Sequence, residues 1–224
     1  MAGRSEELER QRLAKLERII SRGLDPYPAH YKRTHTAAQA QALGAEPEGE
    51  AGASPSISIA GRITAFRAMG KATFLDLRDS TGRIQVYLKR DVLGEERYEL
   101  LRELDLGDFL GVTGRLFRTR TGEITVEASD FTILAKSLRP LPEKWLGLPD
   151  VETRYRQRYL DLIANEDARR IFLLRSRVVS AIRRFLDGRG FTEVETPVLQ
   201  PQAGGAMARP FRSLYNALDR DVYL

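Results

Sequence analysis

The sequence predicts an α+β fold, in which a closed five-stranded barrel follows an N-terminal helix and precedes a mainly helical segment. Three observations predict it. Apolar residues alternate with polar ones over most of residues 57–137, they recur at spacings of three and four near both ends of the chain, and three prolines with a tryptophan break both patterns within 138–150. We therefore divide the 224 residues into a basic helix with a linker (1–56), a barrel domain (57–137), a connector (138–150) and a second domain (151–224).

The first segment has the pattern of a short basic amphipathic helix that ends near Gly23. Its apolar stripe consists of Leu13, Leu16, Ile20 and Leu24. Basic residues surround the stripe at Arg10, Arg12, Lys15, Arg18 and Arg22. Two interpretations remain open at this stage. Either the helix packs on a neighbour by its stripe and the basic side chains lie in water, or the basic side chains face phosphates.

The middle of the chain predicts the barrel. Residues 34–56 show no sustained period and suggest a mobile connection, with a second helix possible over 36–43. Period-two segments then predict five strands, at 57–67, 71–79, 83–90, 108–118 and 123–135. A helical stripe at 92–105 lies between the third and fourth of them. This chain order is typical of an oligonucleotide-binding barrel, or OB-fold, which is a closed Greek-key sheet.

In barrels of this kind the ligand lies across the second and third strands, where aromatic rings stack on bases. The candidates for that surface are Phe66, Arg67, Phe74, Arg78, Gln85 and Tyr87. We expect most of the aromatic ones to be core residues. Phe74 is the best stacking candidate, because it shares an extended segment with Lys71 and Arg78. Gln85 lies on the face opposite its apolar neighbours, so its amide either reads a base edge or is simply solvated.

The second domain begins with helical character over 151–165, and a longer helix starts at Asn165 or Glu166. The apolar stripe of this longer helix consists of Ile171, Leu174, Val178, Ile182 and Phe185. The stripe predicts either an internal core helix or a subunit interface. We favour the subunit interface, because little chain follows that could cover the stripe. An interface strand over 191–198 and a loop with Gly204, Gly205 and Arg209 come next. On their own, these loop residues favour a tight turn with a surface arginine over a ligand site.

Composition excludes several function classes. The sequence has no cysteine and two histidines, so it offers no disulfide, no thiolate nucleophile and no metal cluster built from these residues, and we expect no metal site. No apolar run approaches the roughly 20 residues that span a bilayer, and the start of the chain is charged, so we expect a cytoplasmic protein with no membrane partner. The net charge of +5 and the pI near 9.6 favour a polyanionic partner.

Several long runs carry a family resemblance. RYRQRYLDLIAN, GFTEVETPVLQ, GGAMARPF and NALDRDVYL resemble the opening of the catalytic domain of bacterial lysyl-tRNA synthetases, which are class II enzymes. FTEVETPVL matches the first class II signature, whose fixed element is the proline, here Pro197. The resemblance extends back through the barrel to the helix that ends in LDPYP, and only residues 44–56 look atypical.

The resemblance implies roles for individual positions. In the family the barrel binds the anticodon of the lysine-accepting tRNA, which is rich in uridine, and the N-terminal helix leans on the anticodon stem. Phe74 matches the stacking aromatic, Gln85 and Glu123 match residues that read base edges, and Arg67 matches a basic residue on the same surface. The loop that closes over the amino group of substrate lysine matches Gly204, Gly205 and Ala206. Pro197 matches a residue that contacts the second subunit of a homodimer.

The sequence also departs from the family. The resemblance implies ATP and Mg2+, yet the second and third class II signatures and the glutamates that bind Mg2+ are not found here, and we expect no catalytic residue. We therefore expect an N-terminal portion of a lysine–tRNA ligase that binds tRNA but does not catalyse alone, with a missing half of the catalytic domain as a further partner. Two alternatives remain: a stand-alone RNA-binding module, and an aspartyl- or asparaginyl-type synthetase. The GGAMARPF loop and the LDPYP helix argue against the second alternative, because neither is typical of those synthetases.

Overall fold

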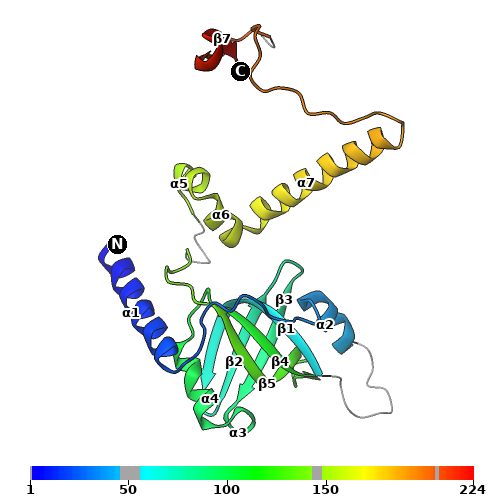
Figure 1. Ribbon diagram of the computed structural model, residues 1–224. Coiled ribbons are helices and arrows are strands. Elements are labelled where there is room, and N and C mark those ends of the chain that lie inside the picture. The colour runs from blue at the N-terminus through cyan, green and yellow to red at the C-terminus, as the bar shows by residue number, and fades with distance from the viewer. Residues whose placement is uncertain (1, 46–55, 143–147, 205–206) are drawn as a thin grey trace. The chain divides into compact units, whose positions relative to one another are not determined.

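The computed structural model describes residues 2–45, 56–142, 148–204 and 207–224, and the chain divides into two units, 1–150 and 151–224 (Figure 1). No helix in the described ranges is long and apolar enough to cross a membrane.

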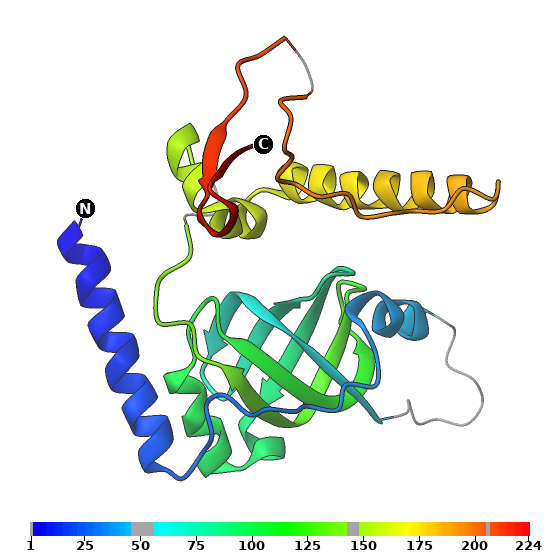
Figure 2. The ribbon, with the colours of Figure 1, turned by 45° about the horizontal axis from the view of Figure 1, so that its top comes forward.

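The first unit is built on a closed five-stranded barrel (Figure 2). Its strands are β1 (Ser56–Met69), β2 (Ala72–Arg78), β3 (Arg83–Lys89), β4 (Phe109–Arg118) and β5 (Ile124–Ala135). The strands neighbour each other in the order β1-β2-β3-β5-β4, and all pairs are antiparallel except β3 with β5. The predicted OB-fold and its five strands are confirmed.

The barrel core follows from the alternation in the sequence, because successive side chains of a strand point to opposite faces. Fully or almost fully buried side chains come from every strand, including Ile57, Ile59, Ile63, Leu75, Leu77, Ile84, Val86, Leu88, Leu110, Val112, Val126 and Phe131. Phe66 packs against this core, as we expected for most of the aromatic candidates. Tyr87 does not meet this expectation, because it is half-buried between the buried Val86 and Leu88 and lies outside the core cluster. At Gly114 the strands β4 and β5 approach so closely that a Cβ would lie 2.0 Å from the carbonyl oxygen of Glu127.

The segment between β3 and β4 closes one side of the core, but it is not the single helix that we predicted over 92–105. It forms α3 (Arg90–Leu93), α4 (Glu95–Glu99) and the short 3₁₀-helix η1 (Leu100–Glu103). Gly94 separates the first two because its φ of 79° lies outside the helical region. The predicted apolar stripe still faces inward, since Tyr98, Leu100, Leu101 and Leu104 are buried.

Two helices precede the barrel: α1 (Ala2–Ser21) and α2 (Ala37–Ala45). The second confirms the helix predicted near 36–43, and it packs beside β1, β3, β4 and β5. The predicted stripe of α1 is wrong in part, because Leu13 and Ile20 are 41% and 54% exposed, while Ile19 is fully buried and Arg12 is 8% exposed.

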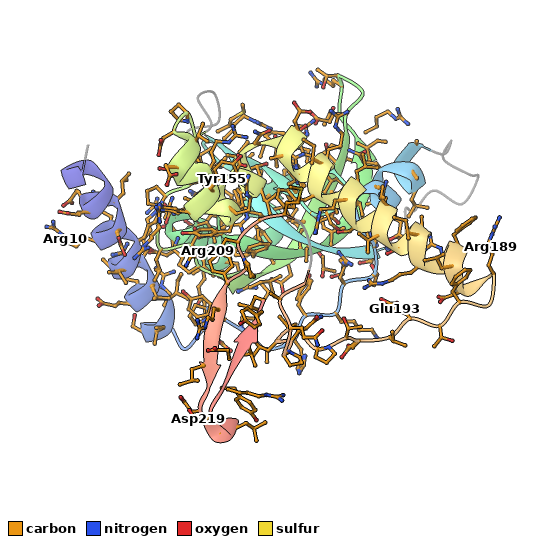
Figure 3. All side chains as sticks on the ribbon, turned by 90° about the horizontal axis from the view of Figure 1, so that it is seen from above. Arg10, Tyr155, Arg189, Glu193, Arg209 and Asp219 are labelled. Carbon is orange, nitrogen blue, oxygen red and sulfur yellow. The ribbon has the colours of Figure 1, made fainter. Side chains whose placement is uncertain are left out.

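The polar contacts of α1 explain this difference. Arg12 donates from Nη1 to the carbonyl oxygens of Ser137 and Arg139, at 2.8 and 2.9 Å, and from Nη2 to Leu106 O at 3.0 Å. Lys15 Nζ donates to Asp105 Oδ1 at 2.7 Å. Neither interpretation of the basic residues therefore holds for these two, since they bind groups of the barrel unit. Arg10, by contrast, points away from the barrel (Figure 3).

The second unit contains α5 (Val151–Arg156), α6 (Arg158–Ala164), α7 (Glu166–Asp187), β6 (Arg212–Tyr215), the short 3₁₀-helix η2 (Asn216–Leu218) and β7 (Arg220–Tyr223). The long helix begins where we predicted, because Asn165 Oδ1 accepts hydrogen bonds from the backbone N–H groups of Asp167 and Ala168. The buried carboxylate of Asp161 accepts from Arg154 Nε at 3.1 Å and so joins α5 to α6.

The strand that we predicted over 191–198 is not present, because the structure assigns no strand in this fully described segment. A strand needs a neighbouring strand for its backbone groups, and the first described β-type pairing after α7 is the isolated bridge between Gln200 and Tyr223. Glu193, labelled in Figure 3, instead forms an ion pair of 2.9 Å with Arg183 of α7.

Candidate nucleic-acid interface

A row of three aromatic rings crosses the outer face of the barrel from β2 to β4. The Phe74 and Tyr87 rings are stacked, with centroids 4.7 Å apart, and the Tyr87 and Phe117 rings are tilted by 55° with centroids 5.9 Å apart. Phe74 and Tyr87 are direct partners in the β2–β3 register. All three rings are half-buried, so each keeps part of its surface in solvent. We call Phe74, Tyr87 and Phe117 the aromatic row.

A hydrogen-bonded polar network lies next to the aromatic row, because residues two apart on a strand share a face. Asp76 follows Phe74 by two positions on β2, and Gln85 precedes Tyr87 by two positions on β3. We call the network, after its central residue, the Arg83 network; it consists of Arg67, Asp76, Arg83, Gln85, Glu123 and Thr125.

Distances within the Arg83 network are those of good hydrogen bonds. Arg67 Nη2 donates to Asp76 Oδ1 at 2.9 Å, and Arg83 Nη1 donates to Asp76 Oδ2 at 2.9 Å. Arg83 Nη2 donates to Glu123 Oε1 at 2.7 Å. Gln85 Nε2 donates to Glu123 Oε2 at 2.9 Å, and Gln85 Oε1 accepts from Thr125 Oγ1 at 2.9 Å. The chain of contacts is therefore continuous from β1 to β5.

The centre of the network is buried, and its charges are paired. The Asp76 side chain is 7% exposed and Gln85 is 8% exposed, so Gln85 is not the simply solvated amide of our second interpretation. The hydrogen bond from Arg83 to Asp76 is the main reason why the pKa of Arg83 is raised, and the charge of Glu123 adds to it. Two guanidinium groups, Arg67 and Arg83, face two carboxylates, which leaves the network with no net charge.

Four of the predicted barrel residues thus lie together: Arg67, Gln85 and Glu123 in the network, with Phe74 beside them in the aromatic row. Sequence reasoning missed Asp76, Arg83, Thr125 and Phe117. The signal for the first two was available, since the turn at 79–82 sets the register that pairs Asp76 with Gln85 and Arg78 with Arg83. Thr125 faces Gln85 only because β5 pairs with β3 in parallel on closure of the barrel, which no local pattern encodes.

The residues that we predicted for sites in the second unit are either exposed or lie outside the described residues. Gly204 and Pro197 are exposed, and Gly205 and Ala206 lie outside the described residues. Arg209, labelled in Figure 3, is also exposed. In the described part of the chain no group of three or more His, Cys, Asp or Glu side chains lies close enough to hold a metal ion, so the Mg2+ implied by the resemblance has no fitting ligand set there.

Comparison with known proteins defines the class of each unit. Residues 57–134 match the family of OB-fold nucleic acid binding domains, and residues 150–224 match the class II tRNA synthetases of the D, K and N type. The barrel thus resembles OB-fold nucleic acid binding domains, and the second unit resembles class II tRNA synthetases.

Several relatives that match nearly the whole chain are lysine–tRNA ligases. Lysine–tRNA ligase from Dehalococcoides mccartyi (strain 195) is 57% identical over 98% of this chain and 44% of its own length. The lysine–tRNA ligase of Pelotomaculum thermopropionicum is 52% identical over the whole chain, and that of Enterococcus faecalis 49% identical over 95% of it. The resemblance to bacterial lysyl-tRNA synthetases is confirmed, and the chain spans less than half the length of these relatives, 44%, 44% and 43% respectively.

Proposed function

We propose that this chain supplies the tRNA-recognising portion of a lysine–tRNA ligase, and that its barrel binds the anticodon loop of lysine-accepting tRNA. The observation that carries the proposal is the aromatic row beside the Arg83 network on an OB-fold face. Single-stranded bases bind such surfaces by stacking on rings and by hydrogen bonds to their edges. The identity to lysine–tRNA ligases supports lysine as the amino acid.

Each predicted residue has a role in this proposal. Phe74 stacks on one anticodon base, with Tyr87 behind it. Gln85 and Glu123 offer an amide donor and a carboxylate acceptor side by side, which suits a uracil edge with its carbonyl oxygens and ring N–H. Arg67 lies at the β1 end of the network, where it borders the same base-binding surface.

The roles of the second unit are proposals as well. Gly204, with Gly205 and Ala206, would close over the amino group of lysine, and Pro197 with the apolar stripe of α7 would contact a second copy of the enzyme. The whole ligase would use ATP and Mg2+ for adenylate formation, and we place it in the cytoplasm.

We expect this chain by itself to show no lysine-dependent exchange of pyrophosphate into ATP, and exchange above background would contradict that expectation.

Binding of anticodon stem-loops tests the main proposal. Fluorescence anisotropy with two labelled stem-loops that differ only in their anticodons, one for lysine and one for aspartate, should show tighter binding of the lysine stem-loop. Equal binding of both would support the stand-alone RNA-binding module instead. Tighter binding of the aspartate stem-loop would support the aspartyl-type alternative, and no binding of either would overturn the proposal.

A further inference from the structure

One guanidinium organises the polar half of the candidate interface. Arg83 is the first residue of β3, and it reaches the strands on both sides of β3: Asp76 on β2, and Glu123 directly before β5. The two contacts use different Nη atoms, at 2.9 and 2.7 Å. A planar guanidinium that holds two carboxylates fixes their relative positions as well as their charges.

The position of Glu123 determines how Gln85 presents its amide. A glutamine amide can flip by 180° unless its partners differ in hydrogen-bonding character. Thr125 can donate or accept, so it does not decide the orientation. The carboxylate of Glu123 only accepts, so the amide nitrogen must face it, as it does at 2.9 Å. Arg83 therefore acts on Gln85 through Glu123.

The charge balance indicates which part of a nucleotide this network suits. The two arginines are neutralised by Asp76 and Glu123, so the network has little attraction for a phosphate. It does offer ordered polar atoms. Gln85 Nε2 has a second hydrogen that no hydrogen bond between described residues engages, and carboxylate oxygens have lone pairs to spare. Such a site fits a neutral base edge.

We propose that Arg83 is a positioning residue for base recognition, which orients Glu123 and thereby Gln85, and which contributes to discrimination between bases rather than to phosphate binding. This inference rests on the proposed function of the barrel. The Arg83 side chain is 52% exposed, so its replacement opens no cavity in the core.

The test uses two stem-loops, the lysine stem-loop and one that differs from it at the central anticodon base. Their binding to the Arg83→Gln variant is compared with their binding to the wild-type chain. We expect the ratio of the two affinities to fall about tenfold, as for loss of one base-edge contact, while the mismatched stem-loop binds as before. Arg83→Lys should also lose discrimination, because an ammonium group cannot hold both carboxylates in a fork. The control Arg102→Gln removes one charge from a side chain that is 75% exposed on η1, and it should change neither affinity.

Two further measurements separate positioning from direct contact. If Arg83 acts through Glu123, the double variant Arg83→Gln, Glu123→Gln should discriminate no worse than Glu123→Gln alone. Additive losses would overturn the inference. The inference would also be overturned if Arg83→Gln weakened the binding of both stem-loops equally and reduced the salt dependence of binding by about one phosphate contact. Failure of the wild-type chain to bind either stem-loop would instead refute the proposed function, whereas undiminished discrimination by both Arg83 variants would refute this inference alone.

Discussion

A ring that stacks on a base works best when it is held in one orientation before the base arrives. Phe74 has this support, because the Tyr87 ring stacks on it with centroids 4.7 Å apart and an interplanar angle of 29°. Restricting the Phe74 rotamer in the free protein lowers the entropy that is lost on binding. At the scale of single residues, the neighbour of the stacking ring therefore matters as well as the ring itself.

Removal of the Phe74 ring tests its role. We expect Phe74→Ala to weaken binding of the lysine stem-loop by about 1 to 3 kcal/mol, the usual worth of stacking one base on an aromatic ring. Phe74→Trp should retain most of the affinity, because it keeps a ring. Anisotropy titrations measure both, with Phe211→Ala as a control at an exposed aromatic residue of the other unit. An alanine variant that binds as tightly as wild type would show that Phe74 does not stack.

How far the sequence predicts this surface depends on how local its determinants are. Phe74 and Gln85 follow from strand alternation, which depends only on neighbours along the chain. The contact between Gln85 and Glu123 depends on closure of the barrel, which brings β5 beside β3. Only the family resemblance indicated Glu123, whereas the turn at 79–82 sets the register that places Arg83 opposite Arg78 and so offered a local signal for Arg83.

At the scale of the helix, α1 shows why a hydrophobic stripe can mislead. The barrel surface that receives α1 is polar: Asp108 is fully buried, Lys136 is 4% exposed, and Lys136 Nζ donates to Asp108 Oδ2 at 2.8 Å. The helix meets this surface with Arg12 and Lys15, and between Glu6 and Ser21 only Ile19 is buried completely. Charged hydrogen bonds, which periodicity of apolar residues does not detect, therefore set the rotation of α1.

Truncation of Arg12 should loosen this helix. Arg12→Ala removes three hydrogen bonds to backbone carbonyls, and because hydrogen bonds to charged groups contribute about 1.5 to 3 kcal/mol, we expect the free energy of unfolding to fall by at least about 2 kcal/mol. Arg10→Ala, the matched control, should change it by less than about 0.5 kcal/mol, because the Arg10 side chain is 74% exposed. Urea denaturation followed by circular dichroism measures both. Equal effects would mean that α1 is not docked through Arg12.

The same junction predicts sensitivity to acid. Burial alone would raise the pKa of Asp105, but hydrogen bonds from Lys136 and Lys15 outweigh it and lower the pKa below its ordinary value of 3.8. A carboxylate whose pKa is lower in the folded state stabilises the fold above its unfolded pKa and loses this contribution as the pH falls through the folded value. Stability should thus be flat above about pH 5 and decline below about pH 4.

Substitution of Asp105 isolates this contribution. Asp105→Asn should lower the stability at pH 7 and make the decline below about pH 4 shallower than in wild type. Thermal melts of the barrel unit between pH 2.5 and 7 measure both effects. Glu152→Gln, at an exposed carboxylate of the second unit, should leave the melt of the barrel unit unchanged. An unaltered acid slope in Asp105→Asn would assign the decline to other groups, of which Asp79 also has a lowered pKa.

On the scale of the whole chain, the two units differ in what they bury. Among the residues whose burial is described, the barrel unit holds almost all of the buried apolar side chains, while the second unit contributes Ala168 and Val222. The predicted stripe of α7 is exposed within the described chain: Ile171, Leu174, Val178, Ile182 and Phe185 are 48% to 61% exposed. An apolar face of this length is typical of an association surface, which supports the proposed homodimer.

A charge placed in the α7 stripe should therefore weaken self-association of the chain. Ile182→Asp would bring an uncompensated carboxylate into the proposed interface in place of an apolar side chain that contributes about 1.5 to 3 kcal/mol when buried. We expect the dissociation constant of the dimer, measured by sedimentation velocity, to rise at least about tenfold. Ser180→Asp, on the opposite face of α7, introduces the same residue at a similar cost in helix propensity and should leave the dissociation constant unchanged. A monomeric wild-type chain at micromolar concentration, or equal effects of the two variants, would show that this face is not the surface through which two copies associate.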